Sequence, residues 1–373
     1  MSGDSTSPSN EPIRPRVRDD LAALTGYHSA QVSVEVRLNT NEAALPPPRG
    51  FAEAVAKAAV EMDWNRYPDR AVRSLRTKIG QRFGLGPDHV FCANGSNEVL
   101  QTVLLTYAGP GRTTLTFEPT YALHRHLARI TGSDPRSADR GDGFRLDPQL
   151  AVAAVAAHRP AVTFLCSPNN PTGLIEPRKA VEAVLEAVEK VNGVLVVDEA
   201  YGEFSTWTAV DMIDEHRPLV VSKTFSKTWA MAGARLGYLL GPTWLVNDLD
   251  MVVLPYHLDT LKQAAGEAAL DFVDEMETRV SRTIEQRGRI EARLRELGCD
   301  VWTSGANFVL FRPIPGGDGT VGKQIWQGLV DRSVLVRDTS SWDRLDGCLR
   351  VTVGTADENG RFLDALADIL EAR

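Results

Sequence analysis

Short apolar runs alternate with helical patterns through the middle of this chain, and this alternation constrains its fold more than any other feature. Six runs have the length and the β-branched composition of strands that are buried on both faces. They are His89–Cys92, Thr113–Phe117, Ala161–Cys166, Val194–Val197, Leu219–Ser222 and Arg235–Leu240. Stretches with helical periodicity, such as Glu98–Tyr107 and Pro177–Val191, lie between several of them. Buried strands that alternate with helices predict an α/β fold with a mostly parallel sheet.

The chain is 373 residues long, which is enough for about two domains. From about Leu261 to Leu297 the pattern becomes long, charged and helical. Shorter strand candidates and an amphipathic helix follow, at residues 307–311, 334–336, 349–353 and from Glu358 onward. We therefore predict three parts: a disordered tail (1–16), a large domain (61–265), and a smaller discontinuous α+β domain (17–60 with 266–373).

Composition excludes several classes of partner. The formal net charge of −8 argues against nucleic acid and against an anionic membrane surface, because both favour basic proteins. The four cysteines, Cys92, Cys166, Cys299 and Cys348, form no CxxC pair, which argues against a disulfide framework and a zinc site. No run approaches the roughly 18 apolar residues of a membrane span, and the N-terminus lacks a signal-peptide core. These features predict a cytoplasmic protein that binds small molecules and no metal.

The segment SKTFSKTWAMAGARLGY, residues 222–238, has the features expected around a lysine that forms a Schiff base. Such a lysine must lose its proton easily, which burial and neighbouring positive charge promote. Small residues after Lys227 let the backbone approach a planar ligand, and Arg235 can bind a phosphate with two hydrogen bonds. Taken alone, Lys227 would be interpreted as an exposed loop lysine, because most lysines are exposed.

Two further strands end near polar side chains that suit the same ligand. Asp198 ends the strand in GVLVVDEAYGEF (193–204), where a carboxylate can pair with a protonated ring nitrogen. Tyr201 can donate to a ligand oxygen, and Asn170 in CSPNNPTG (166–173) can present its amide to the same oxygen. Each also has a plainer interpretation: a helix cap for Asp198, a core tyrosine for Tyr201 and a rigid turn around Asn170.

The segment ANGSNEVLQTVLLTYA (93–108) predicts a strand, a loop and a helix. Gly95, Ser96 and Asn97 could offer backbone N–H groups at the helix N-terminus, where phosphate groups bind readily. Such a loop is a weak signal when it stands alone. Tyr121, in FEPTY (117–121), follows the next strand, and its ring could stack on a flat ligand.

Taken in order, these motifs resemble the fold-type I aminotransferases, which use pyridoxal 5'-phosphate (PLP), and most closely those that act on histidinol phosphate. The resemblance runs from about Leu24 to the C-terminus. Its motifs are LTGYHSA, RLNTNEA, NRYPD, ANGSNE, EPTY, SPNNPTG, VVDEAY, the SK…AGAR segment, ANFVLF, VLVRD and LRVTVGT. It implies a large domain with a mostly parallel, seven-stranded sheet. It also favours Lys227 over Lys223, because only Lys227 keeps the family's spacing to Arg235.

The resemblance implies catalytic and cofactor-binding roles for the residues above. Lys227 would form the Schiff base and move the proton between the substrate Cα and the cofactor carbon. Asp198 would pair with the pyridinium, Asn170 and Tyr201 would bind the phenolic oxygen, and Tyr121 would stack on the ring. The cofactor phosphate would be bound by Gly95, Ser96, Asn97, Thr224, Ser226 and Arg235.

Four more residues follow from the resemblance. Arg350 in LRVTVGT resembles the arginine that binds a substrate α-carboxylate, and Arg337 in VLVRD resembles the one that reads a substrate phosphate. Tyr27 in LTGYHSA resembles a tyrosine that closes on that phosphate. A surface salt bridge for Arg337 and a packed aromatic for Tyr27 are the alternatives. Tyr67 in NRYPD corresponds to a tyrosine that reaches the neighbouring subunit, which implies a homodimer.

The reaction implied is transfer of the amino group of histidinol phosphate to 2-oxoglutarate, as in histidine biosynthesis. The products would be imidazole acetol phosphate and glutamate. An aromatic aminotransferase that acts on phenylalanine is the nearest alternative. A PLP-dependent decarboxylase of an amino-alcohol phosphate and a non-catalytic cofactor-binding protein are the others, and intact Lys227 and Asp198 argue against the last.

Overall fold

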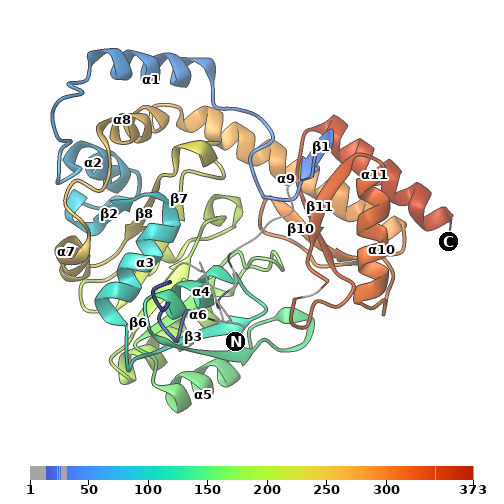
Figure 1. Cartoon of the computed structure of the whole chain (residues 1–373), viewed down its shortest axis with the longest axis horizontal. Coiled ribbons are helices and arrows are strands. Elements are labelled where there is room, and N and C mark those ends of the chain that lie inside the picture. The colour runs from blue at the N-terminus through green and yellow to red at the C-terminus, as the bar shows by residue number, and fades with distance from the viewer. Residues whose placement is uncertain (1–13, 23, 25, 27–31, 341, 373) are drawn as a thin grey trace, which may run out of the picture.

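A computed structural model describes residues 14–22, 24, 26, 32–340 and 342–372, and it contains two β-sheets (Figure 1). We expected a disordered tail at residues 1–16, and its residues 1–13 lie outside the described residues. Residues 14–16 are exposed and have no regular secondary structure. No helix in the described ranges is long and apolar enough to cross a lipid bilayer.

The larger sheet has seven strands and confirms the predicted α/β class. Its order is β2 (Val90–Ala93), β8 (Gly237–Leu240), β7 (Leu219–Thr224), β6 (Val194–Asp198), β5 (Val162–Cys166), β3 (Thr113–Glu118) and β4 (Asp134–Asp139). Strand β8 runs antiparallel to both of its neighbours, and the other pairs are parallel. The carboxyl ends of the parallel strands therefore meet at one edge of the sheet, where ligands bind in such folds.

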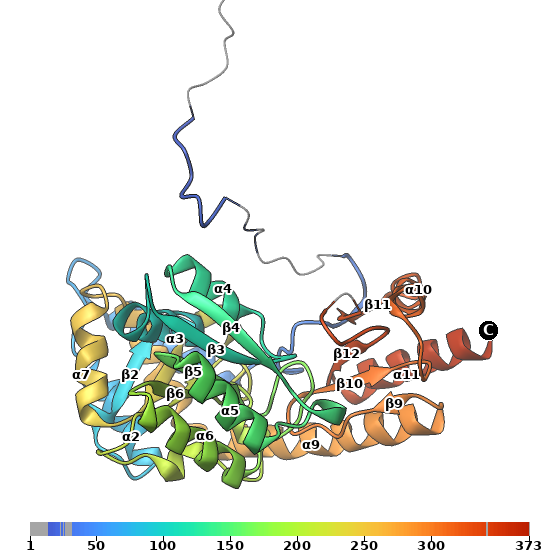
Figure 2. The ribbon, with the colours of Figure 1, turned by 90° about the horizontal axis from the view of Figure 1, so that it is seen from below.

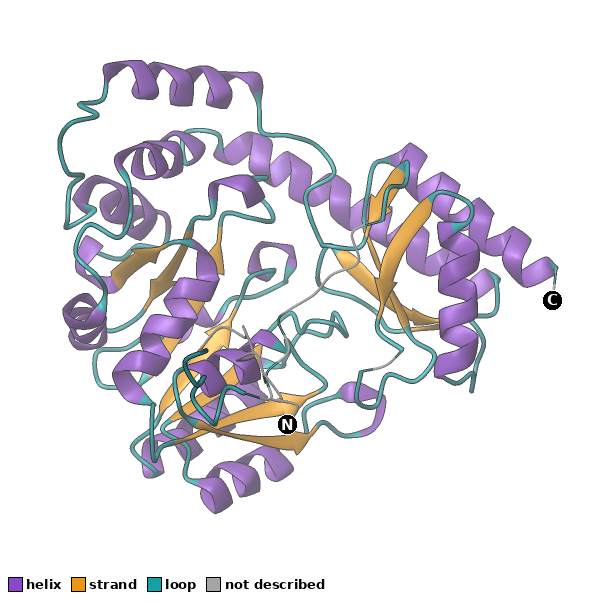
Figure 3. Cartoon of the chain, viewed as in Figure 1, coloured by secondary structure: helices purple, strands orange, loops and turns teal. Residues whose placement is uncertain are grey.

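Helices cover both faces of this sheet because its central strands are buried on both sides (Figures 2 and 3). Along β6, Val194 and Val196 pack into one core while Leu195 and Val197 pack into the other, as the twofold alternation of a strand requires. The first core is completed by α3 (Gly95–Tyr107), α4 (Leu123–Ile130) and α7 (Thr243–Val252). The second contains residues of α2 (Arg73–Arg82), α5 (Pro148–His158) and α6 (Arg178–Lys190).

The smaller sheet combines the two ends of the chain. Its order is β1 (Val36–Leu38), β11 (Val334–Asp338), β12 (Leu349–Thr352), β10 (Phe308–Arg312) and β9 (Asp300–Val301). Strand β1 pairs in parallel with β11, so the segment that follows β1 starts beside the C-terminal strands. Its separate core includes residues of α10 (Gly319–Val330) and α11 (Ala356–Glu371).

The stretch predicted as one long helical pattern forms two helices, α8 (Thr260–Ala269) and α9 (Val273–Glu296). Helix α9 joins the two cores, since Met276 belongs to the core of the larger sheet and Ile290 to that of the smaller. Helix α1 (Arg49–Glu61) packs against α8 (Figure 1). We propose the domain division predicted above, at residues 61–265 and at 17–60 with 266–373.

Candidate active site

A cavity of about 220 Å³ lies at the carboxyl edge of the larger sheet, facing the smaller one. Most of the residues predicted to bind cofactor or substrate line it. They are Ser96, Asn97, Tyr121, Asn170, Asp198, Tyr201, Thr224, Ser226, Lys227, Arg235, Arg337 and Arg350. The lining also includes Asn39, Thr40 and Asn41, which follow β1, and Trp342 from the loop before β12. Residues from both ends and from the middle of the chain thus converge on one site.

Lys227 lies in the loop after β7, and its Nζ donates to the Thr40 carbonyl at 3.1 Å. The pKa of this amine is lowered to about 7, mainly by burial and then by the charge of Arg350, with Glu42 opposing and Arg235 assisting. The ammonium group lies 5.8 Å from the centre of the Tyr201 ring. An amine with this pKa is largely neutral at slightly alkaline pH and can act as a nucleophile.

Lys223, four residues earlier in the SKTFSK segment, has the opposite environment. Its Nζ lies 3.0 Å from Glu199 and 3.3 Å from Glu203, and the side chain is buried. Burial lowers its pKa, but the carboxylates of Glu203 and Glu199 outweigh this and raise the pKa well above the ordinary value. Lys223 therefore stays charged, while Lys227 lines the cavity together with Arg235.

Asp198 ends β6 with its side chain almost fully buried. One carboxylate oxygen is 2.9 Å from His124 Nε2, and the other accepts from the Ala200 N–H at 3.1 Å. His124, from α4, stacks on Phe164 at 4.6 Å and meets the edge of Tyr121. The imidazole therefore fixes the direction of the carboxylate. Sequence reasoning missed His124, because its partner lies 74 residues away along the chain.

Tyr201 and Asn170 each accept a hydrogen bond from a residue outside the larger sheet. The Tyr201 oxygen accepts from Asn41 Nδ2 at 2.9 Å, and its ring meets the edge of Phe308. Burial raises the pKa of this tyrosine well above its usual value, so its proton is retained. The Asn170 side-chain oxygen accepts from the Arg350 guanidinium, which also donates to the Asn39 carbonyl at 3.1 Å.

The N-terminus of α3 and the loop before β8 form a cradle for an anion. Gly95 has a φ of +80°, and a Cβ there would lie 2.9 Å from the Arg235 guanidinium. A Cβ on Gly237 would lie 2.2 Å from the backbone nitrogen of Ser96. Arg235 also donates to Ser226 Oγ at 3.2 Å. Because the first N–H groups of a helix lack intrahelical partners, these donors converge where a phosphate would fit.

Arg337 and Arg350 lie directly opposite each other on the antiparallel strands β11 and β12. Facing like charges repel in a cross-strand pair, and an anion bound between them relieves this repulsion. The Arg337 guanidinium also lies 5.5 Å from the ring centre of Trp342. Among the described residues lining the cavity, Asp198 is the one acidic side chain, against four basic ones: Lys227, Arg235, Arg337 and Arg350. The site is built for a ligand with more than one anionic group.

Two predicted site residues in the described part of the chain do not line the cavity. Gly95 lies just beneath it at the start of α3, where its missing side chain admits Arg235. Tyr67 is 80% exposed, stacks on Tyr256 at 4.5 Å and is not among the residues that line the cavity. Tyr27 lies outside the described residues. Asn307, next to β10, donates to the Asn41 carbonyl at 3.1 Å.

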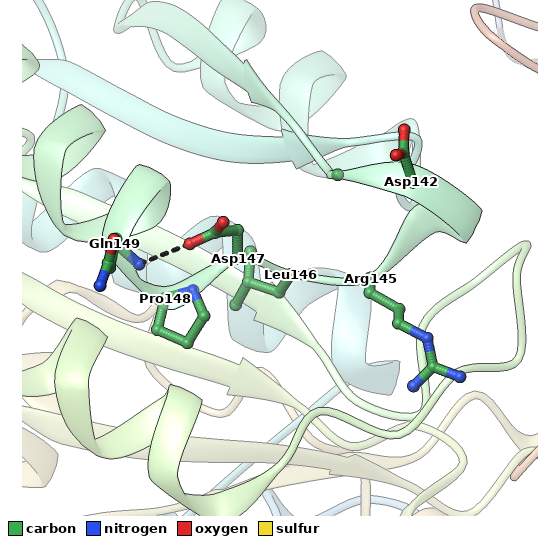
Figure 4. A pocket seen from close by; sticks show the side chains of 7 residues that line it. Asp142, Arg145, Leu146, Asp147, Pro148 and Gln149 are labelled. Carbon is green, nitrogen blue, oxygen red and sulfur yellow. Dashed lines mark hydrogen bonds between the residues drawn. The ribbon is translucent and has the colours of Figure 1, made fainter.

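Another hollow lies on the surface ahead of α5 (Figure 4). Asp147 there accepts from the N–H groups of Gln149 and Leu150 at 2.8 and 3.2 Å, and so caps the helix. Its acidic group thus has a structural role, and this hollow lacks the converging donors of the main cavity.

Comparison with known proteins agrees with this site. A model of the family described as aminotransferase class I and II matches residues 33–366. The chain therefore belongs to the class I and II aminotransferases, and its cofactor is PLP.

Individual relatives are more specific. The histidinol-phosphate aminotransferase of Frankia casuarinae is 43% identical over 366 residues, which cover 95% of this chain and 90% of that protein. The protein of the same name from Thermobifida fusca is 42% identical and covers 94% of each chain. A crystal structure of histidinol-phosphate aminotransferase from Sinorhizobium meliloti with pyridoxal-5'-phosphate matches with a TM-score of 0.84 at 22% identity. That match covers 91% of this chain and 92% of the other, and shows the shared fold.

Proposed function

We propose that this chain transfers the amino group of histidinol phosphate to 2-oxoglutarate, a step of histidine biosynthesis. The observation that carries the proposal is the cross-strand pair of Arg337 and Arg350, both of which line the cavity that also contains the phosphate cradle. Full-length relatives more than 40% identical to this chain have the name histidinol-phosphate aminotransferase, and this supports it. The overall charge and the four unpaired cysteines fit the cytoplasm, where we place the reaction.

PLP, when bound, supplies an aldehyde and a ring that withdraws electrons from the substrate carbon. Lys227 would bind the aldehyde covalently and, once released by substrate, take the proton from the carbon that bears the amine. Asp198, oriented by His124, would keep the ring nitrogen protonated, with Tyr121 stacked on the ring. Tyr201 and Asn170 would bind the phenolic oxygen.

The cofactor phosphate would lie at the N-terminus of α3. Backbone N–H groups there suit the phosphate oxygens, and the positive end of the helix stabilises their charge. Arg235 adds a guanidinium that can bind in a bidentate manner. The full set is Gly95, Ser96, Asn97, Thr224, Ser226 and Arg235.

At the substrate end, Arg337 would bind the phosphate of histidinol phosphate, and Arg350 would bind the α-carboxylate of 2-oxoglutarate and glutamate. The guanidinium of Arg350 is already oriented by Asn170 and by the Asn39 carbonyl. Tyr27 would complete the phosphate site from the N-terminal segment. Domain closure over these groups would exclude water from the reacting carbon.

We also propose a homodimer in which Tyr67 reaches the cofactor phosphate of the neighbouring subunit. Tyr67 projects from a segment with two other strongly exposed apolar residues, Val60 (85%) and Trp64 (72%). Tyr256, on which it stacks, lies in a second such segment with Met251 (77%) and Leu254 (75%). Exposed aromatic and aliphatic side chains gathered in this way are typical of an interface.

The decisive experiment compares kcat/KM for histidinol phosphate and for phenylalanine, each with 2-oxoglutarate. We expect histidinol phosphate to be strongly preferred. Changing Arg337→Ala should lower its kcat/KM by at least about 30-fold, since losing one partner of a desolvated charge pair costs about 2–5 kcal/mol. Turnover of phenylalanine, which has no phosphate, should change little.

Arg332→Ala is the matched control, because Arg332 is an exposed arginine just before β11 and outside the cavity lining. If Arg337→Ala lowers kcat/KM equally for both substrates, Arg337 does not bind the substrate phosphate. A wild-type preference for phenylalanine would replace the proposal by an aromatic aminotransferase, for which the aromatic lining of Tyr121, Tyr201 and Trp342 is suitable.

A further inference from the structure

The three residues that follow β1, Asn39, Thr40 and Asn41, each form one hydrogen bond to a different functional group. The Asn39 carbonyl accepts from Arg350, and the Thr40 carbonyl accepts from Lys227. Asn41 uses its side chain and donates to the Tyr201 hydroxyl at 2.9 Å. Two of these contacts use backbone carbonyls and depend little on residue type. The third depends on the identity of residue 41.

The Asn41 side chain is held in a defined orientation. Thr352 Oγ1 accepts from the Asn41 backbone N–H at 3.0 Å, so its own proton is available to the Asn41 side-chain oxygen 3.1 Å away. This contact assigns the oxygen of the amide to Thr352 and turns its NH₂ group toward Tyr201. Asn41 is almost fully buried and has a φ of +54°, which asparagine tolerates better than most residues.

The direction of this hydrogen bond determines what Tyr201 can do. A tyrosine hydroxyl has one proton, and an amide NH₂ group can only donate. When the Tyr201 oxygen accepts from Asn41, its proton is left to point into the cavity that Tyr201 lines. A carboxylate at position 41 would do the reverse and take the proton away from the cavity.

We propose that Asn41 is a positioning residue that directs the Tyr201 hydroxyl proton toward the phenolic oxygen of PLP. This inference rests on the proposed role of Tyr201. It also connects the two sheets, because Asn41 donates to Tyr201, which follows β6 of the larger sheet, and is held by Thr352 of β12 in the smaller sheet. Strand β12 carries Arg350 as well, so the same strand contacts the substrate and, through Asn41, the hydroxyl that contacts the cofactor.

The absorbance of the bound cofactor reports this arrangement directly. A hydrogen bond donated to the phenolic oxygen stabilises its negative charge and weakens its hold on the proton shared with the lysine nitrogen. Removing the donor makes the oxygen more basic, so that proton is retained to higher pH. The pH midpoint of the absorbance change should rise by about one unit when one charge-assisted hydrogen bond is lost.

The test is a spectroscopic pH titration of the holoenzyme. Tyr201→Phe should raise the midpoint. Asn41→Gly, which removes the amide but keeps the backbone conformation accessible, should raise it in the same direction. The double variant should show no further rise. Asn307→Ala, which releases the backbone carbonyls of Asn41 and Glu42 but leaves the Asn41 amide in place, should titrate like the wild type.

The outcomes separate the two claims. An unchanged midpoint in Tyr201→Phe removes the proposed role of Tyr201 itself. A raised midpoint in Tyr201→Phe with a wild-type midpoint in Asn41→Gly overturns the inference about Asn41 alone, as does a further rise in the double variant. An equal rise in Asn307→Ala would show that displacement of the segment, not the amide, is responsible. If Asn41→Gly fails to fold, Thr352→Val must show the rise, and a wild-type midpoint there overturns the inference.

Discussion

At the scale of single residues, the environments of Lys223 and Lys227 determine which lysine is nucleophilic. Both follow a serine in SKTFSK, and both are withdrawn from solvent. Two carboxylates keep Lys223 charged, whereas Lys227 has the positive charges of Arg350 and Arg235 nearby. The two lysines differ in their charged neighbours, and of these only Arg235 lies in the same segment of sequence.

The pKa of about 7 for Lys227 predicts how the apoenzyme captures PLP. Only the neutral amine attacks the aldehyde, so the rate should rise with pH, from about a tenth of its maximum at pH 6 to about nine tenths at pH 8. Mixing apoenzyme with PLP at a series of pH values and following the absorbance measures this profile. Lys227→Ala should form no bond that borohydride can reduce, and an intact bond in that variant would refute the assignment.

Arg350→Gln provides the control for this profile. Removing a positive charge that lowers the Lys227 pKa should move the midpoint upward, while the titration of the PLP phosphate stays the same. A profile with its midpoint near 10 in the wild type would mean that burial and Arg350 do not act on this amine.

The sequence predicted which residues form the site better than it predicted which other residues contact them. Lys227, Asp198, Asn170, Tyr201 and Arg235 follow from strand ends and motif spacing, and the structure brings them to one cavity. His124 and Asn41 were not singled out. Their importance comes from hydrogen bonds to residues 74 and 160 positions away, which no local pattern encodes.

At the scale of elements, the sequence predicted buried strands well and the polar edge poorly. β5, β6 and the first half of β7 are mostly apolar on both faces, so each stands out as a hydrophobic run. β4, with the sequence DPRSAD, lies at the edge of the sheet and is largely exposed, so hydrophobicity does not mark it. The break between α8 and α9 was also missed, since the apolar pattern continues through Leu270 and Phe272.

The contact between α3 and the loop before β8 leads to a prediction for Gly95. Alanine there would be strained at a φ of +80°, and its Cβ would meet the Arg235 guanidinium at 2.9 Å. Gly95→Ala should therefore weaken PLP binding by about tenfold or more, the cost of one to two kcal/mol in backbone strain and displaced donors. Binding of pyridoxal, which lacks the phosphate, should change much less.

Gly233→Ala is the matched control, because a Cβ at Gly233 meets no atom within 4 Å and its φ is not positive. It should bind both ligands like the wild type. Equal losses for PLP and pyridoxal in Gly95→Ala would indicate general damage to the site, and would contradict a phosphate cradle at the start of α3.

At the scale of the whole molecule, charge is distributed unevenly. The chain has a formal net charge of −8, yet the cavity lining has four basic side chains and one acidic one. A positive cavity in a negative protein attracts anions locally without favouring nucleic acid or anionic lipid. This contrast agrees with substrates that carry phosphate and carboxylate groups.

The proposed dimer can be tested by mixing two inactive variants. A Tyr67→Ala subunit has an intact Lys227 but cannot complete its neighbour's site, and a Lys227→Ala subunit has the opposite defect. In a mixed dimer one of the two sites receives both Lys227 and Tyr67. Random re-association makes half of the dimers mixed, so activity should recover to about a quarter of that of the wild type. If the activity of the mixture equals only the summed activities of the two variants, Tyr67 acts within its own subunit or has no role in the site.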